Sequence, residues 1–150
     1  MKTLFVSICL LLSIGVQAQK LKWETDFTVA KQQALQTNKP ILMYFTGSDW
    51  CIPCKQLKSD FFATEKFESV ANNFVLLRVD FPFREDIISK EQRVKNEELA
   101  KIYNPEKSFP TLVGVNGYGS LIKTINGYSP LRETELHYAF LKDVSYTKLH

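Results

Sequence analysis

Residues 41–55 begin with the apolar run Ile41-Leu42-Met43-Tyr44-Phe45 and end with Trp50-Cys51-Ile52-Pro53-Cys54-Lys55. A continuous apolar run of this length is typical of a strand that is covered on both faces. On a helix that begins near Cys51, residues three apart share one face, so Cys51 and Cys54 can approach within bonding distance. A strand that leads into Cys-x-x-Cys at the start of a helix indicates reversible dithiol–disulfide exchange.

The position of each cysteine on this helix predicts its role. Cys51 lies at the helix N-terminus, where unpaired backbone N–H groups and the positive end of the helix dipole favour a thiolate. Pro53 falls in the first turn, where its missing N–H costs little. Cys54 lies one turn deeper, and we expect it to be more buried and to keep its proton. Cys51 is therefore expected to attack a partner's disulfide, and Cys54 to resolve the mixed disulfide.

Three other interpretations of the pair stay open. A structural disulfide here would close a very short loop and stabilise by about 2 kcal/mol, against about 3 kcal/mol for a 15-residue loop. A metal site needs three or four ligands, and beyond the two thiols the sequence offers only His137 and His150, both far along the chain. A cysteine protease needs a His and an Asn or Asp that converge on one cysteine, and it leaves the second cysteine unexplained.

Residues 1–18 read as a secretory signal. Lys2 precedes an almost wholly apolar stretch from Leu4 to Val16, and small residues stand before a cleavage point ahead of Gln19. The stretch is too short to span a bilayer comfortably, which takes about 20 residues, although a retained anchor stays open. Cys9 falls inside this segment, so cleavage leaves Cys51 and Cys54 as the only thiols. Residues 19–150 have the size of one domain. We expect this domain to be exported to a compartment where disulfides persist.

The charge balance bears on whether the partner is a nucleic acid. The chain has 150 residues, with 19 Lys and Arg against 16 Asp and Glu, and its formal net charge is +3. No dense basic stretch is present to neutralise phosphates, which argues against nucleic acid as the main partner.

Hydrophobic periodicity predicts alternating helices and strands followed by a hairpin. The expected helices cover 27–37, a span from Cys51 to Phe61 or Phe62, a short segment after Thr64, 91–103 and 130–144. The expected strands cover 41–45, 74–79, 111–115 and 121–125, with Asn116-Gly117 as the hairpin signal. The last helix is expected to bury Leu131, Leu136, Phe140 and Leu141. This order implies an α/β fold with a mixed sheet and helices on both faces.

These residues resemble the thioredoxin superfamily. Three elements carry the resemblance: the strand into the dithiol motif, the strand that ends at Val79-Asp80, and Phe109-Pro110-Thr111, which opens the hairpin. The match runs from Lys39 to the C-terminus. It is closest to exported bacterial thioredoxin-like proteins, similar to the C-terminal domain of the transmembrane thiol:disulfide interchange reductase and to periplasmic disulfide isomerases. The resemblance implies a thioredoxin fold, with a sheet of about four to five strands.

The resemblance also implies how the site is built. A cis peptide bond before Pro110 would pack against the thiols, and the Phe109 backbone would pair with the substrate chain. Trp50 would shield Cys51 and offer a contact surface. The buried carboxylate of typical thioredoxins corresponds here to Tyr44 or Phe45, and its partner lysine to Leu76. The proton-transfer groups are therefore absent, or replaced by Asp49, Lys55 or water.

Two further features bear on function. Oxidants and isomerases of this superfamily often carry a histidine between the cysteines, so Ile52-Pro53 predicts a more reducing couple, in the lower half of the range from about −270 to about −120 mV. The segment from Arg84 to Lys107 is longer than the family needs. Its charges favour either a recognition flap over the thiols or a solvated helical insertion.

The expected function is that of a thiol–disulfide oxidoreductase that reduces or isomerises disulfides in periplasmic or secreted proteins. We expect a monomer that receives electrons from a membrane or soluble thiol donor, and no metal, nucleotide or flavin is implied. The alternative is a thioredoxin-fold binding or chaperone module with little redox turnover, which the missing buried acid motivates.

Overall fold

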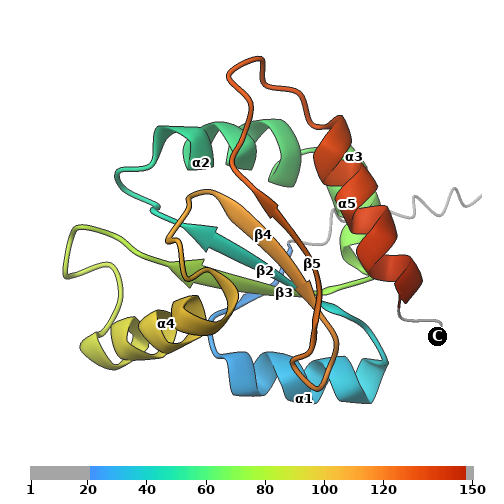
Figure 1. Ribbon diagram of the computed structural model, residues 1–150, viewed down its shortest axis with the longest axis horizontal. Coiled ribbons are helices and arrows are strands. Elements are labelled where there is room, and N and C mark those ends of the chain that lie inside the picture. Colours follow the sequence, from blue (N-terminus) through green and yellow to red (C-terminus); the bar gives the residue numbers. More distant parts are fainter. Residues whose placement is uncertain (1–20, 148–150) are drawn as a thin grey trace, which may run out of the picture.

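The computed structural model describes residues 21–147, so the expected signal segment, Cys9 and His150 lie outside the described chain. The described residues form a five-stranded sheet in the order β1-β3-β2-β4-β5, with helices on both faces (Figure 1). β1, β3 and β2 run parallel, whereas β4 and β5 are antiparallel to their neighbours. The predicted mixed sheet, flanked by helices, is confirmed.

The bounds of most elements agree with the sequence pattern to within a few residues. The strands are β1 Trp23–Glu24, β2 Ile41–Thr46, β3 Val75–Asp80, β4 Thr111–Val115 and β5 Leu121–Asn126. The helices are α1 Phe27–Thr37, α2 Ile52–Leu57, the π-helix η1 Lys58–Phe62, α3 Glu65–Ala71, α4 Lys90–Tyr103 and α5 Glu135–Tyr146. β1 was not predicted, because two residues are too few to show a strand periodicity.

The central strand β2 is buried along its whole length, as its apolar run predicts. Leu42 and Tyr44 pack toward α2, η1, α3 and α5, whereas the alternate residues Ile41, Met43 and Phe45 pack toward α1 and α4. Side chains alternate across a strand. The sheet therefore separates two hydrophobic cores, and the dithiol belongs to the one that contains Tyr44.

The helix after the dithiol changes its winding midway. α2 ends at Leu57, and the Ala63 N–H donates to the Lys58 carbonyl at 2.9 Å, closing the wider turn of a π-helix. Phe61 and Phe62 are both buried there. Thr64 then caps α3, as expected, by accepting a hydrogen bond from the Phe67 N–H.

The prediction for the last helix is wrong at its start. α5 begins at Glu135 rather than near residue 130, and Leu131 and Leu136, both expected inside, are exposed by 77% and 73%. The Arg132 side chain instead binds Asp60 on η1 and holds residues 127–134 as a loop. Because the helix starts later, its buried face comprises His137, Phe140, Leu141 and Val144.

The charged segment from Arg84 to Lys107 contains α4, which packs with Leu99 and Ala100 on the face of the sheet opposite α2. The helical interpretation of this segment is therefore confirmed for residues 90–103. The loop that precedes α4 starts where β3 ends. Within residues 21–147, no helix is long and apolar enough to cross a membrane.

Candidate active site

Cys51 and Cys54 form a disulfide at the start of α2, with their Cα atoms 5.3 Å apart. Cys51 is the N-cap residue, in an extended conformation, and its sulfur accepts the Cys54 N–H at 3.3 Å. Pro53 occupies the first turn, as predicted. The two cysteines are 3% and 1% exposed, so the expected difference in burial is small in this oxidised state. The helix N-terminus is thus directed at the Cys51 sulfur.

Tyr44 lies on the dithiol side of the sheet, and Phe45 lies on the other. The Tyr44 hydroxyl donates to the Cys54 carbonyl at 3.0 Å. Burial raises the pKa of Tyr44 to about 12, so its proton stays in place at neutral pH. The position beneath Cys54 therefore holds a fixed hydrogen-bond donor, where typical thioredoxins place a titrating acid.

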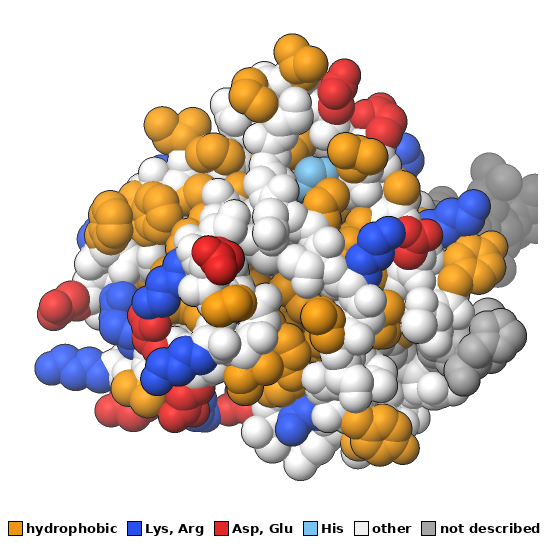
Figure 2. Space-filling view, viewed as in Figure 1, with side chains coloured by type: hydrophobic (Ala, Val, Ile, Leu, Met, Phe, Trp, Pro, Cys, Tyr) orange, Lys and Arg blue, Asp and Glu red, His pale blue; other side chains and the backbone are white. Residues whose placement is uncertain are grey.

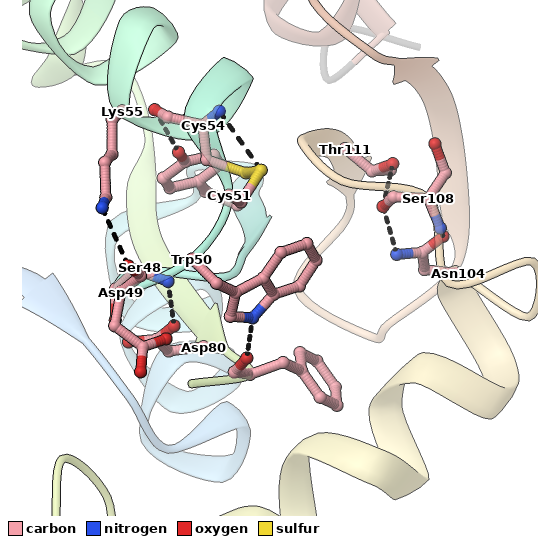
Figure 3. Close-up of a disulfide and its surroundings, with 12 residues drawn as sticks. Ser48, Asp49, Trp50, Cys51, Cys54, Lys55, Asp80, Asn104, Ser108 and Thr111 are labelled. Carbon is pink, nitrogen blue, oxygen red and sulfur yellow. Dashed lines mark hydrogen bonds between the residues drawn. A yellow bond between two sulfur atoms is a disulfide. The ribbon is translucent and has the colours of Figure 1, made fainter. Parts of the chain in front are cut away.

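Asp49 and Lys55, the two suggested replacements for that acid, are engaged elsewhere, and Figure 3 shows the bond from Lys55 to the Asp49 backbone. The Asp49 carboxylate accepts the backbone N–H groups of Phe83 at 3.0 Å and Arg84 at 2.9 Å. These bonds lower the pKa of Asp49, with the Arg84 N–H contributing most. The Lys55 ammonium donates to the Asp49 carbonyl at 2.8 Å. Both side chains hold the loop before α2, and neither bonds a cysteine.

A cavity of about 600 Å³ lies beside Cys54, between α2 with η1 and the sheet. Its walls include the aromatic rings of Trp23, Tyr44 and Phe62, and three cationic side chains, Lys55, Lys58 and Arg78. Arg78 stands opposite Tyr44 in the β2–β3 register. Positive charge near a thiol favours its thiolate. Replacement of the buried acid by water stays a prediction.

The peptide bond between Phe109 and Pro110 is cis, as the resemblance implied. Phe109 packs against both cores, including the one that contains Cys51. The Pro110 carbonyl accepts the Gly127 N–H at 2.7 Å, which joins the proline to the end of β5. The structure thereby brings Pro110 and Phe109 to the same end of the sheet as the dithiol.

A polar network holds this proline loop, and the sequence pattern did not reveal it. The Asn104 side chain, which is buried, donates to the Ser108 carbonyl at 2.9 Å and accepts the Ser108 N–H at 3.1 Å. The Thr111 hydroxyl donates to the same carbonyl at 2.9 Å. Figure 3 shows this network across from the disulfide. The only local signal was Asn104-Pro105, which predicts a helix end but not a buried amide.

Trp50, the residue before Cys51, is partly buried and lies between several elements. Its indole N–H donates to the Phe81 carbonyl at 2.7 Å, beyond the end of β3. Its ring contacts Phe109 edge-on at 5.6 Å and stacks on Phe83 at 4.9 Å. Trp50 thus joins the dithiol loop to the proline loop and to the loop before α4.

Of the two candidate metal ligands, His137 lies within the described residues, and it is enclosed in a hydrophobic core. Its ring lies 5.5 Å from Phe61 and 5.5 Å from Tyr128, and burial lowers its pKa. In the described part of the chain, no three His, Cys, Asp or Glu side chains are placed to hold one metal ion. The ring fills the space between α5 and η1.

Together, a dithiol at a helix N-terminus and a neighbouring cis-proline on this fold define a thiol–disulfide oxidoreductase. Residues 22–115 match the thioredoxin-like family. The chain belongs to that family.

Comparison with individual proteins shows which thioredoxin-like proteins this chain resembles. The chain is 33% identical to the disulfide bond reductase DsbH of Chlamydia pneumoniae over 116 residues, which cover 77% of this chain and 68% of that protein. A solved DsbH oxidoreductase superposes with a TM-score of 0.71 at 26% identity, covering 94% and 95% of the two chains. The oxidised C-terminal domain of DsbD from Neisseria meningitidis shares the fold, with a TM-score of 0.51 at 15% identity over 77% and 90% of the chains.

Proposed function

We propose that this protein reduces disulfides in exported proteins, with Cys51 as the nucleophile and Cys54 as the resolving thiol. The observation that carries the proposal is the Cys51–Cys54 disulfide at the N-terminus of α2. The similarity to a disulfide bond reductase supports the direction of the reaction. Export rests on the signal-like residues 1–18, and we propose a periplasmic or secreted monomer.

The proposed reaction moves two electrons from the dithiol to the client. The Cys51 thiolate attacks one sulfur of the client's disulfide, so that a Cys51–client bond forms and the other client sulfur leaves as a thiolate. Cys54, once deprotonated, attacks the Cys51 sulfur, and the second client thiolate leaves. Both client thiolates take up protons from water. The protein is left with the Cys51–Cys54 disulfide, which an external dithiol donor must reduce before the next cycle.

The surrounding residues have supporting roles in this proposal. Pro53 fixes the first turn of α2, which directs the helix N-terminus at Cys51. Pro110 shapes the surface next to the disulfide, and the Phe109 backbone holds the client chain beside the mixed disulfide. Trp50 covers one side of Cys51 and contacts Phe109.

A reductase is favoured over an oxidant by the residues between the cysteines. Ile52 and Pro53 provide no cation or histidine that would further stabilise the Cys51 thiolate, and a less stabilised dithiol form gives a lower reduction potential. We expect a value near or below about −230 mV, closer to thioredoxin at about −270 mV than to disulfide isomerase at about −180 mV.

The reduction potential is the measurement that tests this proposal. The purified protein, with Cys9 replaced by serine, is equilibrated in glutathione and dithiothreitol buffers, and the dithiol fraction is counted by thiol alkylation and mass spectrometry. Insulin reduction with dithiothreitol as donor supplies the activity. A potential above about −180 mV would contradict a reductase and indicate an oxidant or isomerase.

One observation favours a second candidate, a binding or chaperone module with little turnover. Tyr44 replaces the acid that assists the deeper cysteine in typical thioredoxins, and its pKa of about 12 prevents it from acting as a base. The Cys51→Ser variant separates the two functions. A reductase loses insulin reduction in this variant, whereas a binding module keeps its protection of a heat-denatured client.

A further inference from the structure

The loop that follows β3 is fixed against the dithiol loop by hydrogen bonds from several sides. Asp49 accepts the N–H groups of Phe83 and Arg84, and the Trp50 indole donates to the Phe81 carbonyl. The Ser48 N–H donates to the buried Asp80 carboxylate at 3.0 Å. The position of this loop is therefore set by the residues just before Cys51.

The same loop is held from the other side by α4. Arg93 donates to the Pro82 carbonyl at 3.1 Å, and the buried Asn96 amide donates to the Asp80 carbonyl at 2.7 Å. Residues 80–84 are thus fixed between α4 and the dithiol loop. A side chain carried by this segment has a defined place relative to Cys51.

The side chain presented there is Phe83, which is 75% exposed. One face of its ring stacks on Trp50, with centroids 4.9 Å apart and planes 15° from parallel. Trp50 continues the aromatic contact to Phe109. Ile52, immediately after Cys51, is 67% exposed. Trp50, Phe83 and Phe109 thus form a continuous aromatic contact beside Cys51. We call these three residues, together with the neighbouring Ile52, the apolar collar.

Charged side chains border this collar on one side. Arg84 and Asp86 pair with each other at 2.5 Å, next to Phe83 in the chain. Figure 2 shows hydrophobic side chains gathered at the left edge of the molecule, over the β2–α2 and β3–α4 loops, with charged side chains below them. An exposed apolar surface with a polar rim is typical of an interaction site.

We propose that Phe83 is a specificity-determining residue, and that the collar binds an apolar side chain next to the cysteine of an extended client segment. The inference rests on the proposed function, because attack by Cys51 brings the client's cysteine to this place. Side chains alternate across an extended chain, which advances about 3.3 Å per residue, so a side chain two positions from that cysteine lies about 7 Å along the chain and on the same face as the cysteine side chain. This is the side chain that the Trp50–Phe83 pair would contact. Clients with apolar residues two positions from their cysteines are then favoured over clients with polar residues there.

The proposal assigns client recognition to the loop of residues 80–84 rather than to the charged side chains of α4. The partner-recognition flap considered for residues 84–107 would act through charged side chains over the thiols. Instead, α4 packs on the opposite face of the sheet, and the aromatic ring just before this segment contacts Trp50. Asp49 is the positioning residue that holds the ring there.

The test uses competition between two peptides for Cys51. In a Cys9→Ser/Cys54→Ser protein, Cys51 is the only cysteine. Two peptides, identical except for leucine or serine two positions before and two positions after one cysteine, are supplied as mixed disulfides with glutathione. The Cys51 thiolate attacks the peptide sulfur, glutathione leaves as a thiolate, and the equilibrium ratio of the two protein–peptide disulfides is read by intact-mass spectrometry.

The leucine peptide is expected to be favoured by about 3- to 10-fold, the range expected for partial burial of an apolar side chain. Phe83→Ala should remove most of this preference, Phe83→Leu should keep most of it, and Asp49→Ala should reduce it. Tyr118→Ala is the matched control, because Tyr118 is an 81% exposed aromatic residue at the β4–β5 hairpin, at the opposite end of the sheet. Its ratio should equal that of the parent.

A parent protein without leucine preference, or an unchanged ratio in Phe83→Ala, would overturn the inference. The ratio is measured at equilibrium and needs no turnover. Failure of the parent dithiol protein to reduce insulin would therefore count against the proposed function alone. Normal insulin reduction with no effect of Phe83→Ala on the ratio would count against the inference alone.

Discussion

Replacing Tyr44 with phenylalanine removes a single hydroxyl from beneath Cys54. This hydroxyl, on a residue only 5% exposed, donates to the Cys54 carbonyl at 3.0 Å. That carbonyl also accepts the Lys58 N–H, so it is not left without a partner in the variant. The loss should therefore be the net value of one hydrogen bond, about 1 kcal/mol, rather than the larger penalty of an unsatisfied buried carbonyl. Urea unfolding of the oxidised protein measures it.

Tyr103→Phe is the matched control for this substitution. The Tyr103 hydroxyl also donates to a backbone carbonyl, that of Gly119 at 2.7 Å, but it lies on α4, on the other side of the sheet. The two variants should lose similar amounts of unfolding free energy. A loss above about 3 kcal/mol in Tyr44→Phe alone would refute the assignment of a single replaceable hydrogen bond.

The effect of Tyr44→Phe on disulfide exchange should be small. With a pKa of about 12, the hydroxyl cannot take the proton of Cys54 at neutral pH. We expect the rate of insulin reduction to change by less than about threefold and its dependence on pH to be unchanged, because loss of a general base costs about 100-fold or more. A loss of that size, absent from Tyr103→Phe, would show that Tyr44 transfers the proton after all.

Three other substitutions test the cavity, the loop and the sheet. Arg78→Gln, beside Cys54, should slow resolution of the mixed disulfide about two- to tenfold at neutral pH, measured by rapid quenching, and an unchanged rate would exclude a role for this cation. The Arg132 guanidinium holds the pKa of Asp60 well below its usual range, so this carboxylate stabilises the fold above about pH 4 and the contribution is lost as pH falls through the folded-state pKa. Asp60→Asn should therefore be less stable at pH 7, with a shallower loss of urea stability below pH 4, and parallel pH curves would contradict this. A Cβ atom at Gly114 would lie 2.4 Å from the Val144 Cγ2 atom, so Gly114→Ala should cost about 1 to 3 kcal/mol in thermal unfolding, most of it recovered when Val144 is shortened to alanine.

The parts of the fold that could be predicted are those whose signals lie in short, local sequence patterns. A continuous apolar run predicted β2, Cys-x-x-Cys at the start of a helix predicted the dithiol, and Thr64 marked the start of a helix. Each of these signals depends on residues adjacent in the chain, so one sequence is sufficient. The cis bond before Pro110 came from the family resemblance, because an isolated X-Pro bond favours trans.

The parts that could not be predicted depend on pairs of residues far apart in the chain. The late start of α5 follows from the pairing of Arg132 with Asp60, 72 positions away, and periodicity does not detect such a contact. The choice between Tyr44 and Phe45 beneath Cys54 depended on the length of one loop, which only the three-dimensional register resolves. Asn104 looked like a helix end and proved to be a buried support of the proline loop.

The surroundings of the disulfide differ in chemistry on its two sides, which α2 separates. The Cys51 side has the apolar collar of Trp50, Ile52, Phe83 and Phe109, with no titrating group among them. The Cys54 side has an open cavity with Lys55, Lys58 and Arg78 on its walls. Choice of client would therefore depend on the collar, and proton transfer on the cavity. Because the helix keeps the collar and the cavity apart, client preference can change through residue 83 while the proton-transfer step stays as it is. Under the proposed function, a chain that lacks the buried acid of typical thioredoxins can in this way remain a thiol–disulfide oxidoreductase, with water in the cationic cavity expected to exchange the proton that the carboxylate would have carried.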